Sequence, residues 1–228
     1  MRPGDRVNPL LGDSLSAPDA RTPHPGNLRR TMPPATGPSR SDGSATVELL
    51  SRRPFVAYVH RVLTAAESRY LAQRASAATR GDARTATMSE SGRYSRDRVV
   101  RSLQRRLVEL TSRSVAQFEP MTAVLCRRGQ SLRPHWDAEE YPRGLRESGQ
   151  SVLSVFVHLT TLTAADGGAL AFPRLGLEVQ PVAGDAVWWQ NVTPSGRVLR
   201  KTLHFGAEVV SEVEKWAINV WIRERSSR

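Results

Sequence analysis

The chain has 228 residues, 39% of them hydrophobic and 24% charged, which is enough for a buried core. The formal net charge is +11, but no run of five basic residues occurs and aromatic residues make up only 6%. This pattern favours a solvated basic surface over a nucleic-acid site. Because there is no long apolar stretch, no signal peptide and only one cysteine, Cys126, we expect a soluble, intracellular protein.

Residues 1–45 are dominated by Pro, Gly, Ser, Arg and Asp, and their few apolar residues follow no period. Such a segment cannot bury enough surface to offset the entropy of ordering it. We therefore predict a disordered tail over 1–45 and one folded domain over 46–228.

The first half of this domain favours two strands followed by two helices. Thr64 and Glu67 have the spacing of a capping box, which predicts the start of the first helix, and Gly81 is expected to end it. The strands are expected at 47–50 and 55–59 and the helices at 64–78 and 97–113, with a loop over 81–96.

The second half has strand-like patterning interrupted by Gly and Pro, which indicates a β-sandwich or barrel with a helical layer on one side. Of Trp188 and Trp189, one should face the barrel interior and the other the core beneath the helices; the pattern does not say which. Strands are expected at 121–126, 152–159, 169–172, 177–180, 186–190, 200–205 and 215–222.

A histidine and an aspartate, His135 and Asp137, are two residues apart, so on a strand they would share a face. An imidazole and a carboxylate suit iron(II), which often takes two histidines and one carboxylate. The tripeptide alone favours a surface histidine hydrogen-bonded to a neighbouring carboxylate. The metal interpretation therefore needs a second histidine.

The other four histidines differ in their surroundings. His24 is in the tail, His60 is expected at the surface or at a cap, and His158 is expected in the core of an apolar strand. His204 is in a late strand 67 residues after Asp137, a separation that lets intervening hairpins fold back beside the first pair. His204 is therefore the candidate third ligand.

The last strand has two different faces. Lys215, Ala217, Asn219 and Trp221 alternate with a fully apolar set. A buried lysine is costly without a partner, and an anionic ligand would supply one. The alternative is that Lys215 lies at the strand end and reaches water.

Several motifs, in order, resemble the prolyl 4-hydroxylase-like family of iron(II)/2-oxoglutarate dioxygenases. The resemblance covers about residues 47–225. The motifs are Gly129-Gln130-Ser131-Leu132-Arg133-Pro134-His135-Trp136-Asp137, Gly167-Gly168 with Phe172-Pro173, Val179-x-Pro181-x-x-Gly184-Asp185-Ala186, His204, and Lys215-Trp216 with Trp221.

The resemblance implies a mainly β fold with flanking helices and a double-stranded β-helix (jelly-roll, cupin-like) core. It implies that His135, Asp137 and His204 bind Fe(2+) and that Lys215 pairs with the distal carboxylate of 2-oxoglutarate. The implied reaction uses dioxygen to hydroxylate an unactivated C–H bond, with peptidyl proline favoured, and releases succinate and carbon dioxide. Ascorbate is a candidate auxiliary factor, and Trp136 and Trp221 are candidate substrate contacts.

The chain departs from the family pattern at the cosubstrate site. Cys126 is at the position where the family has a tyrosine that helps to hold 2-oxoglutarate, and Leu170 is where its hairpin often has a threonine. His204 and Lys215 are eleven residues apart, one more than is common in the family. Two alternatives stay open, a hydroxylase of a free amino acid or small molecule, and a catalytically silent jelly-roll that binds an acidic partner through its arginines.

Overall fold

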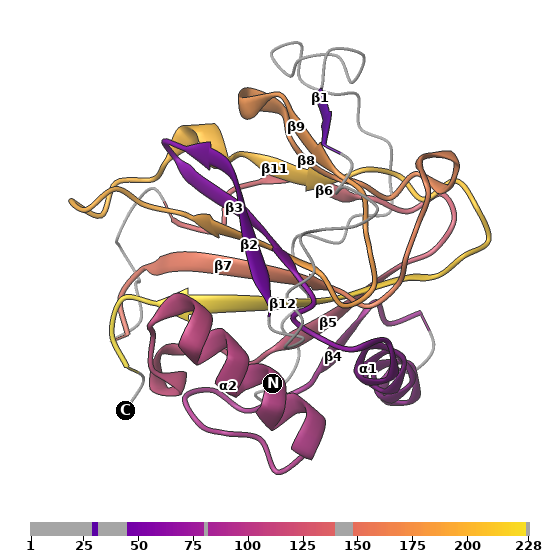
Figure 1. Ribbon diagram of the computed structural model, residues 1–228, viewed down its shortest axis with the longest axis horizontal. Coiled ribbons are helices and arrows are strands. Elements are labelled where there is room, and N and C mark those ends of the chain that lie inside the picture. Colours follow the sequence, from indigo (N-terminus) through magenta and orange to yellow (C-terminus); the bar gives the residue numbers. More distant parts are fainter. Residues whose placement is uncertain (1–28, 32–44, 80–81, 140–147, 227–228) are drawn as a thin grey trace, which may run out of the picture.

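Two β-sheets face one another, and two helices cover the outer face of the larger sheet (Figure 1). The structure is a computed structural model that describes residues 29–31, 45–79, 82–139 and 148–226. The larger sheet has the order β2-β3-β10-β7-β12-β5-β4, and the smaller sheet has the order β1-β9-β8-β11-β6. The strands are β1 Arg29–Thr31, β2 Thr46–Arg52, β3 Phe55–His60, β4 Thr85–Thr87, β5 Thr122–Cys126, β6 Leu132–His135, β7 Ser151–His158, β8 Leu170–Phe172, β9 Leu177–Val179, β10 Ala186–Gln190, β11 His204–Gly206 and β12 Lys215–Arg223.

Neighbouring strands are antiparallel in both sheets, except that β1 pairs in parallel with β9. This arrangement confirms the predicted mainly β fold with flanking helices and a jelly-roll core. Short 3-10 turns connect several strands. They are η2 Val115–Gln117, η3 Ala164–Asp166, η4 Pro173–Leu175 and η5 Arg200–Thr202.

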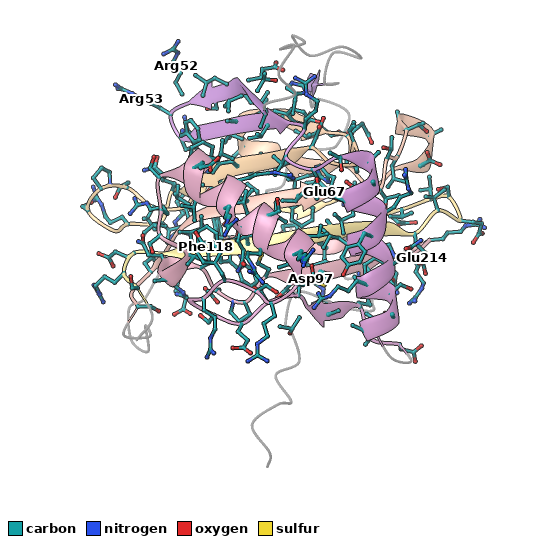
Figure 2. All side chains as sticks on the ribbon, turned by 60° about the horizontal axis from the view of Figure 1, so that its bottom comes forward. Arg52, Arg53, Glu67, Asp97, Phe118 and Glu214 are labelled. Atoms are coloured by element: carbon teal, nitrogen blue, oxygen red, sulfur yellow. The ribbon has the colours of Figure 1, made fainter. Side chains whose placement is uncertain are left out.

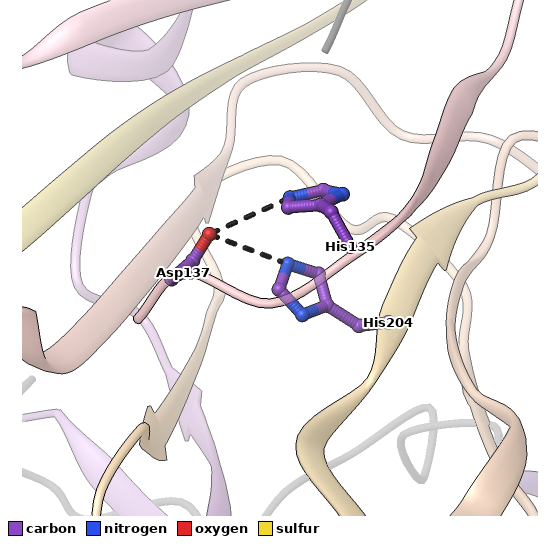
Figure 3. Close-up of side chains that lie close together, drawn as sticks. All are labelled: His135, Asp137 and His204. Atoms are coloured by element: carbon purple, nitrogen blue, oxygen red, sulfur yellow. Dashed lines mark ion pairs between the residues drawn. The ribbon is translucent and has the colours of Figure 1, made fainter. Parts of the chain in front are cut away.

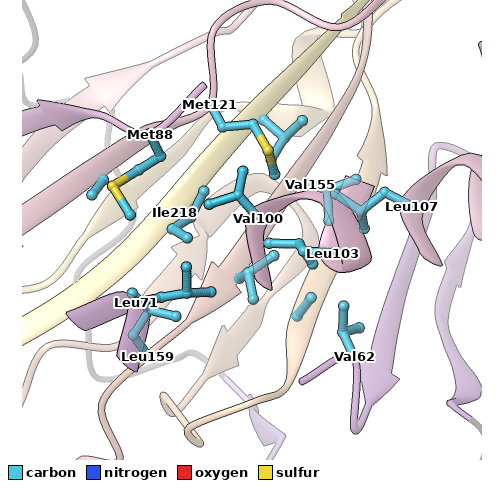
Figure 4. Packing of buried hydrophobic residues seen from close by; sticks show 14 of the residues in the cluster. Val62, Leu71, Met88, Val100, Leu103, Leu107, Met121, Val155, Leu159 and Ile218 are labelled. Carbon is cyan, nitrogen blue, oxygen red and sulfur yellow. The ribbon is translucent and has the colours of Figure 1, made fainter. Parts of the chain in front are cut away.

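The helices α1 (Ala65–Ala78) and α2 (Arg98–Thr111) bury an apolar face against the larger sheet. Figure 4 shows this helix-side core, where Leu71 of α1 and Leu103 of α2 pack with Ile218 of β12. The strand β12 contributes its apolar face here, as its alternation predicted. Its other face, which begins with Lys215, points between the two sheets.

A second core fills the space between the sheets and forms the inside of the barrel. Trp189 belongs to this inner core, whereas Trp188 packs with the helix-side core and lies 4.8 Å, centroid to centroid, from the ring of Phe55. The structure thus decides which of the two tryptophans faces the interior.

Three local predictions were wrong. Residues 200–205 do not form one strand, because the Leu199 carbonyl accepts hydrogen bonds from the Thr202 amide and hydroxyl, which closes the turn η5 before β11 begins. The expected loop over 81–96 contains β4. His60 is buried, at 7% exposure, and lies 3.6 Å from a carboxylate oxygen of Asp185.

The strand β6 was also missed, and it contains a proline. Pro134 has no backbone N–H for a sheet hydrogen bond, so it is tolerated mainly on edge strands. The strand β6 is an edge strand, paired only with β11 within the described part of the chain.

The predicted tail lies mostly outside the described residues. Its described segment, Arg29–Thr31, forms β1 along the edge strand β9. Within the described ranges, no helix is long and apolar enough to cross a membrane.

The two helices begin with side-chain caps, and Figure 2 labels the acidic residues involved. Thr64 and Glu67 form the predicted capping box of α1. Asp97 caps α2 by accepting hydrogen bonds from the amides of Val99 and Val100. Its other oxygen accepts a hydrogen bond from the Tyr70 hydroxyl of α1 at 2.6 Å, so this cap also joins the two helices.

We expect Asp97→Ala to destabilise the fold by about 1–2 kcal/mol, the upper range for loss of a helix N-cap. Burial opposes ionisation of Asp97, but the hydroxyl of Tyr70, the amides of Val100 and Val99 and the guanidinium of Arg74 together lower its pKa. The stability that ionised Asp97 contributes is fully present above the unfolded-state pKa of about 3.9 and is lost as the pH falls through the lower folded-state pKa. Urea unfolding of the variant at several pH values measures it.

Asp97→Asn is the matched control, because asparagine caps a helix about as well but carries no charge. Its cost should be smaller than that of the alanine variant at neutral pH. Equal costs for the two variants would contradict the capping account.

Candidate active site

Three side chains converge between the sheets, and they come from two neighbouring strand ends (Figure 3). His135 ends β6, Asp137 follows two residues later, and His204 begins β11 directly opposite His135. The Oδ1 atom of Asp137 lies 3.4 Å from Nε2 of His135 and 3.7 Å from Nε2 of His204. The candidate ligand atoms of the three residues all lie within 4.8 Å of one another.

Backbone carbonyls orient both imidazoles. Nδ1 of His135 lies 2.6 Å from the Arg133 carbonyl oxygen, and Nδ1 of His204 lies 3.0 Å from the Thr202 carbonyl oxygen. A carbonyl only accepts hydrogen bonds, so Nδ1 of each ring carries the proton. The lone pair of each Nε2 is therefore directed at the space beside Asp137, which is the usual arrangement of metal-binding histidines.

The Asp137 carboxylate is held from one side only. Its Oδ2 accepts a hydrogen bond of 2.6 Å from the Ser154 hydroxyl, and Ser154 Oγ in turn accepts one of 2.8 Å from the Asn191 amide. Its Oδ1 is buried and has no hydrogen-bond partner among the described residues. A buried carboxylate oxygen without a partner is costly, and a bound cation would satisfy it.

The charges of the three residues suit a cation. Burial opposes ionisation of Asp137, but His204, His135 and the Ser154 hydroxyl outweigh it and lower its pKa to about 2. Burial lowers the pKa of His204 to about 4, so this imidazole is neutral at pH 7. For His135, burial is outweighed by the Asp137 carboxylate and the Arg133 carbonyl, and the net pKa is raised.

Aromatic rings pack against His204 and fix its position. Its ring centroid lies 4.8 Å from that of Trp189 and 5.6 Å from that of Phe172. The adjoining pocket has a mostly apolar wall that includes the two histidines. It is lined by Thr122, Val124, Leu132, His135, Phe156, Leu170, Trp189, His204, Asn219 and Trp221.

Lys215 is buried behind this pocket at 2% exposure, and its Nζ has no hydrogen-bond partner among the described residues. Nζ lies 5.7 Å from the ring centroid of Phe156, which lines the pocket. Burial lowers the pKa of Lys215. Burial and the nearby charge of Lys215 lower the pKa of His158 to about 3. The alternative of a solvent-reaching lysine is excluded. Phe156 thus has the buried ammonium of Lys215 near its ring and lines the same pocket as His135 and His204.

Residues 121–223 match the model of the 2OG-Fe(II) oxygenase superfamily. The chain is 27% identical to "Probable prolyl 4-hydroxylase 10" of Arabidopsis thaliana, over 86% of this chain and 78% of that protein. It is 30% identical to the prolyl 4-hydroxylase subunit alpha-1 of Gallus gallus, over 56% of this chain but only 25% of that subunit.

The matched segment, residues 121–223, belongs to the 2OG-Fe(II) oxygenase superfamily. It is a prolyl 4-hydroxylase-like 2-oxoglutarate-dependent dioxygenase, and its cofactors are Fe(2+) and 2-oxoglutarate. Its fold is similar to that of the viral collagen prolyl hydroxylase vCPH from Paramecium Bursaria Chlorella virus-1. The TM-score is 0.63 at 22% identity, over 74% of this chain and 89% of that chain.

Two of the three departures of this oxygenase from its family pattern, Cys126 and Leu170, are placed by the structure relative to the pocket. Cys126 is buried directly opposite Lys215 in the pairing of β5 with β12, and its Sγ lies 3.5 Å from Nη2 of Arg84. Unlike Thr122 and Val124 on the same strand face, Cys126 does not line the pocket. Leu170 does line it, so an apolar side chain occupies the threonine position of the family's hairpin.

Gly168 of this hairpin lets the backbone approach Lys215 closely. Its φ is +69°, and a Cβ there would lie 2.6 Å from Cδ1 of Leu162 and 3.3 Å from Cδ of Lys215. Only glycine therefore fits beside the lysine stem. The glycine motif noted in the sequence thus lets the hairpin pack against the stem of Lys215.

Sequence reasoning missed Ser154 and Asn191, which hold Asp137 in place. Both are polar residues in or after apolar strands, at 0% and 1% exposure. A serine in the middle of the apolar run 152–159 was the available signal, because a buried hydroxyl requires a partner. Its partner is 17 residues away in the chain, so the spacing alone did not reveal it.

We expect Ser154→Ala to weaken iron(II) binding by roughly 10–100-fold, the usual effect of removing a group that orients a metal ligand. The Asp137 carboxylate would lose the hydroxyl that fixes Oδ2 and would rotate more freely. Competition against a chelating dye measures the change in affinity. Ser68→Ala is the control, because Ser68 is equally buried but bonds to the Thr64 carbonyl in α1. Equal weakening in both variants would contradict the positioning role.

Proposed function

We propose that this oxygenase holds one ferrous ion with His135, Asp137 and His204, binds 2-oxoglutarate with Lys215, and hydroxylates peptidyl proline with release of succinate and carbon dioxide. The observation that carries the proposal is the buried Oδ1 of Asp137, which has no hydrogen-bond partner and faces both Nε2 atoms.

The donor set fits iron. Two imidazoles and one carboxylate form the facial arrangement typical of non-heme iron(II) oxygenases, and they leave positions open for other ligands. Adjacent ligands of an octahedral ion with bonds of roughly 2.1 Å lie about 3 Å apart. The Oδ1–Nε2 distances of 3.4 and 3.7 Å need only a small contraction to reach this spacing.

When bound, iron and 2-oxoglutarate supply the oxidising chemistry that protein side chains lack. The side chains of this protein position the cosubstrate and shield it from water. The Lys215 ammonium is a fixed point charge for a carboxylate, and its burial makes the pairing strong because little water competes for it. Phe156, Leu170 and Val124 form apolar walls that exclude water. Asn219, whose Oδ1 also has no hydrogen-bond partner among the described residues, is a polar group of this wall.

Proline in a peptide is the proposed substrate because a relative aligned over most of this chain is named as a probable prolyl 4-hydroxylase. Trp221 lines the pocket near the histidines, which supports it as a substrate contact. Trp136 lies beside the pocket and not in its lining, so its role would be at the entrance. A free amino acid or other small molecule is the alternative substrate.

The test is incubation of the full chain with iron(II), 2-oxoglutarate, ascorbate and proline-containing peptides under labelled dioxygen. Mass spectrometry should find one labelled oxygen atom on proline. The same peptides with proline replaced by alanine should gain none. Label on the alanine peptides, or on free amino acids but never on peptidyl proline, would overturn the assigned substrate.

A further inference from the structure

A second buried polar side chain, that of His158, lies at the end of β7. His158 is 0% exposed, and neither Nδ1 nor Nε2 of its ring has a hydrogen-bond partner among the described residues. Burying a polar group costs free energy unless a new hydrogen bond replaces the one that water would make. Two such atoms in one buried ring indicate a place where a ligand supplies the missing partner.

The alternation of β7 directs His158 into the space between the two sheets. Ser154, Phe156 and His158 share one face of this strand. Ser154 hydrogen-bonds to a proposed iron ligand, and Phe156 lines the pocket. The residues between them, Val155 and Val157, pack in the helix-side core. His158 therefore lies on the same inner face as the residues that build the active site.

His158 is also a neighbour of Lys215. It is directly opposite Ala217 in the pairing of β7 with β12, and Lys215 is two residues before Ala217 on the same face. Such diagonal neighbours lie roughly 7–8 Å apart, within reach of long side chains. The ring centroid of Phe156 lies 5.5 Å from that of His158 and 5.7 Å from Nζ of Lys215. Both unpaired groups thus lie next to the same residue of the pocket wall.

The two side chains offer hydrogen-bond donors of different kinds. Burial and the charge of Lys215 lower the pKa of His158 to about 3, so the ring is neutral at pH 7 and carries one N–H donor. The ammonium of Lys215 has three donors and no acceptor. A hydrogen bond from Lys215 to the ring would still leave the N–H of His158 unpaired. A carboxylate has two acceptor oxygens, so it can accept a hydrogen bond from each side chain.

We infer that His158 binds the cosubstrate: one ring nitrogen donates a hydrogen bond to the distal carboxylate of 2-oxoglutarate, next to the ammonium of Lys215. This inference rests on the proposed function, which pairs that carboxylate with Lys215, and it adds the neutral donor of the site. The family pattern has a tyrosine and a threonine where this chain has Cys126 and Leu170. Leucine has no donor, and the sulfur of Cys126 lies against Nη2 of Arg84. His158 supplies from β7 the hydrogen bond that these two positions do not.

The test measures cosubstrate binding to the full chain loaded with zinc(II), which has no redox chemistry. Calorimetry compares 2-oxoglutarate with 2-oxovalerate, which has the same carbon chain but a methyl group in place of the distal carboxylate. His158→Leu should weaken 2-oxoglutarate binding by roughly 10–100-fold, the range for a hydrogen bond to a charged group. Binding of 2-oxovalerate should not weaken, because its methyl group accepts no hydrogen bond.

Two further variants separate binding from packing. His158→Gln keeps a side-chain N–H donor and should retain more of the affinity than leucine does. His60→Leu is the matched control and should keep the affinity, because His60 is a buried histidine of the same sheet whose ring lies 3.6 Å from Asp185. Without cosubstrate, His158→Leu should unfold at a higher urea concentration than the wild type, since two unpaired polar atoms leave the core. A histidine that only fills space would show lower stability and unchanged affinity on replacement.

Nitrogen NMR of the zinc-loaded wild type with labelled histidine gives a second measurement. The N–H signal of His158, identified by its absence from His158→Gln, should shift downfield when 2-oxoglutarate is added. It should not shift with 2-oxovalerate. If His158→Leu does not fold, this signal decides between the two roles.

Four results would overturn the inference: unchanged 2-oxoglutarate affinity in His158→Leu, an equal loss of 2-oxovalerate binding, an equal loss in His60→Leu, or a nitrogen signal that does not shift. If the affinity depends on His158 but peptidyl proline is never hydroxylated, the cosubstrate site stands and the proposed function fails. If peptidyl proline is hydroxylated and His158→Leu binds 2-oxoglutarate as the wild type does, only this inference fails.

Discussion

His204→Ala should abolish turnover of 2-oxoglutarate and weaken iron(II) binding by more than about 100-fold, beyond the range for groups that merely orient ligands. The imidazole is one of the three donors that converge on Oδ1 of Asp137, and its burial keeps it neutral and ready to bind at pH 7. Alanine offers no lone pair there. Calorimetric titration with iron(II) under nitrogen and succinate release measure the two effects.

The fold should survive this change at reduced stability. Removing the imidazole leaves a cavity against the rings of Trp189 and Phe172, and such truncations cost roughly 2–5 kcal/mol. Circular dichroism and thermal unfolding therefore accompany the assay. His60→Gln is the control, because His60 is also a buried histidine but lies outside the cluster. Normal iron binding by His204→Ala would remove this residue from the site.

Lys215→Met should have opposite effects on stability and on cosubstrate affinity. The buried ammonium has no partner in the described fold, and burial lowers its pKa, so at pH 7 the charge opposes folding. Methionine has a similar length and no charge. Without cosubstrate, we expect the free energy of unfolding of the variant to be higher by roughly 1–4 kcal/mol, as for other replacements of buried charges. Unfolding in urea measures this difference.

The same change should raise the 2-oxoglutarate concentration needed for half-maximal turnover by roughly 10²–10³-fold, because the cosubstrate carboxylate would be buried without a partner. Lys201→Met is the control, since Lys201 is the only other lysine of the chain and is exposed. It should change neither quantity. A Lys215→Met variant that loses stability and keeps its cosubstrate affinity would contradict the assignment.

Part of the candidate site could be predicted from local spacing in the sequence. The two-residue separation of His135 and Asp137 and the alternation along β12 both report on one strand face, which is a local property. The alternation placed Lys215 on the face opposite the apolar one but left open whether it reaches water, and the structure shows that it is buried. The pairing with His204 rested on order along the chain and on the family resemblance, and the structure brings these three side chains together.

Other features depend on contacts between distant segments, which spacing does not encode. The hydrogen bonds from Asn191 to Ser154 and from Ser154 to Asp137 join β7 to the segments that follow β10 and β6. The strand β6 escaped prediction because Pro134 is tolerated only through its edge position, which is a property of the whole sheet. The choice between Trp188 and Trp189 likewise required knowing which face of β10 the helices cover.

The central claim is that His135, Asp137 and His204 hold the iron of a working oxygenase. Release of succinate from 2-oxoglutarate by the full chain, titrated with iron(II), tests it most directly. We expect activity to rise to a plateau at one iron per chain, and Asp137→Ala to show none at any iron concentration. Wild-type chain that binds no iron(II), or succinate release that continues in Asp137→Ala, would contradict the account.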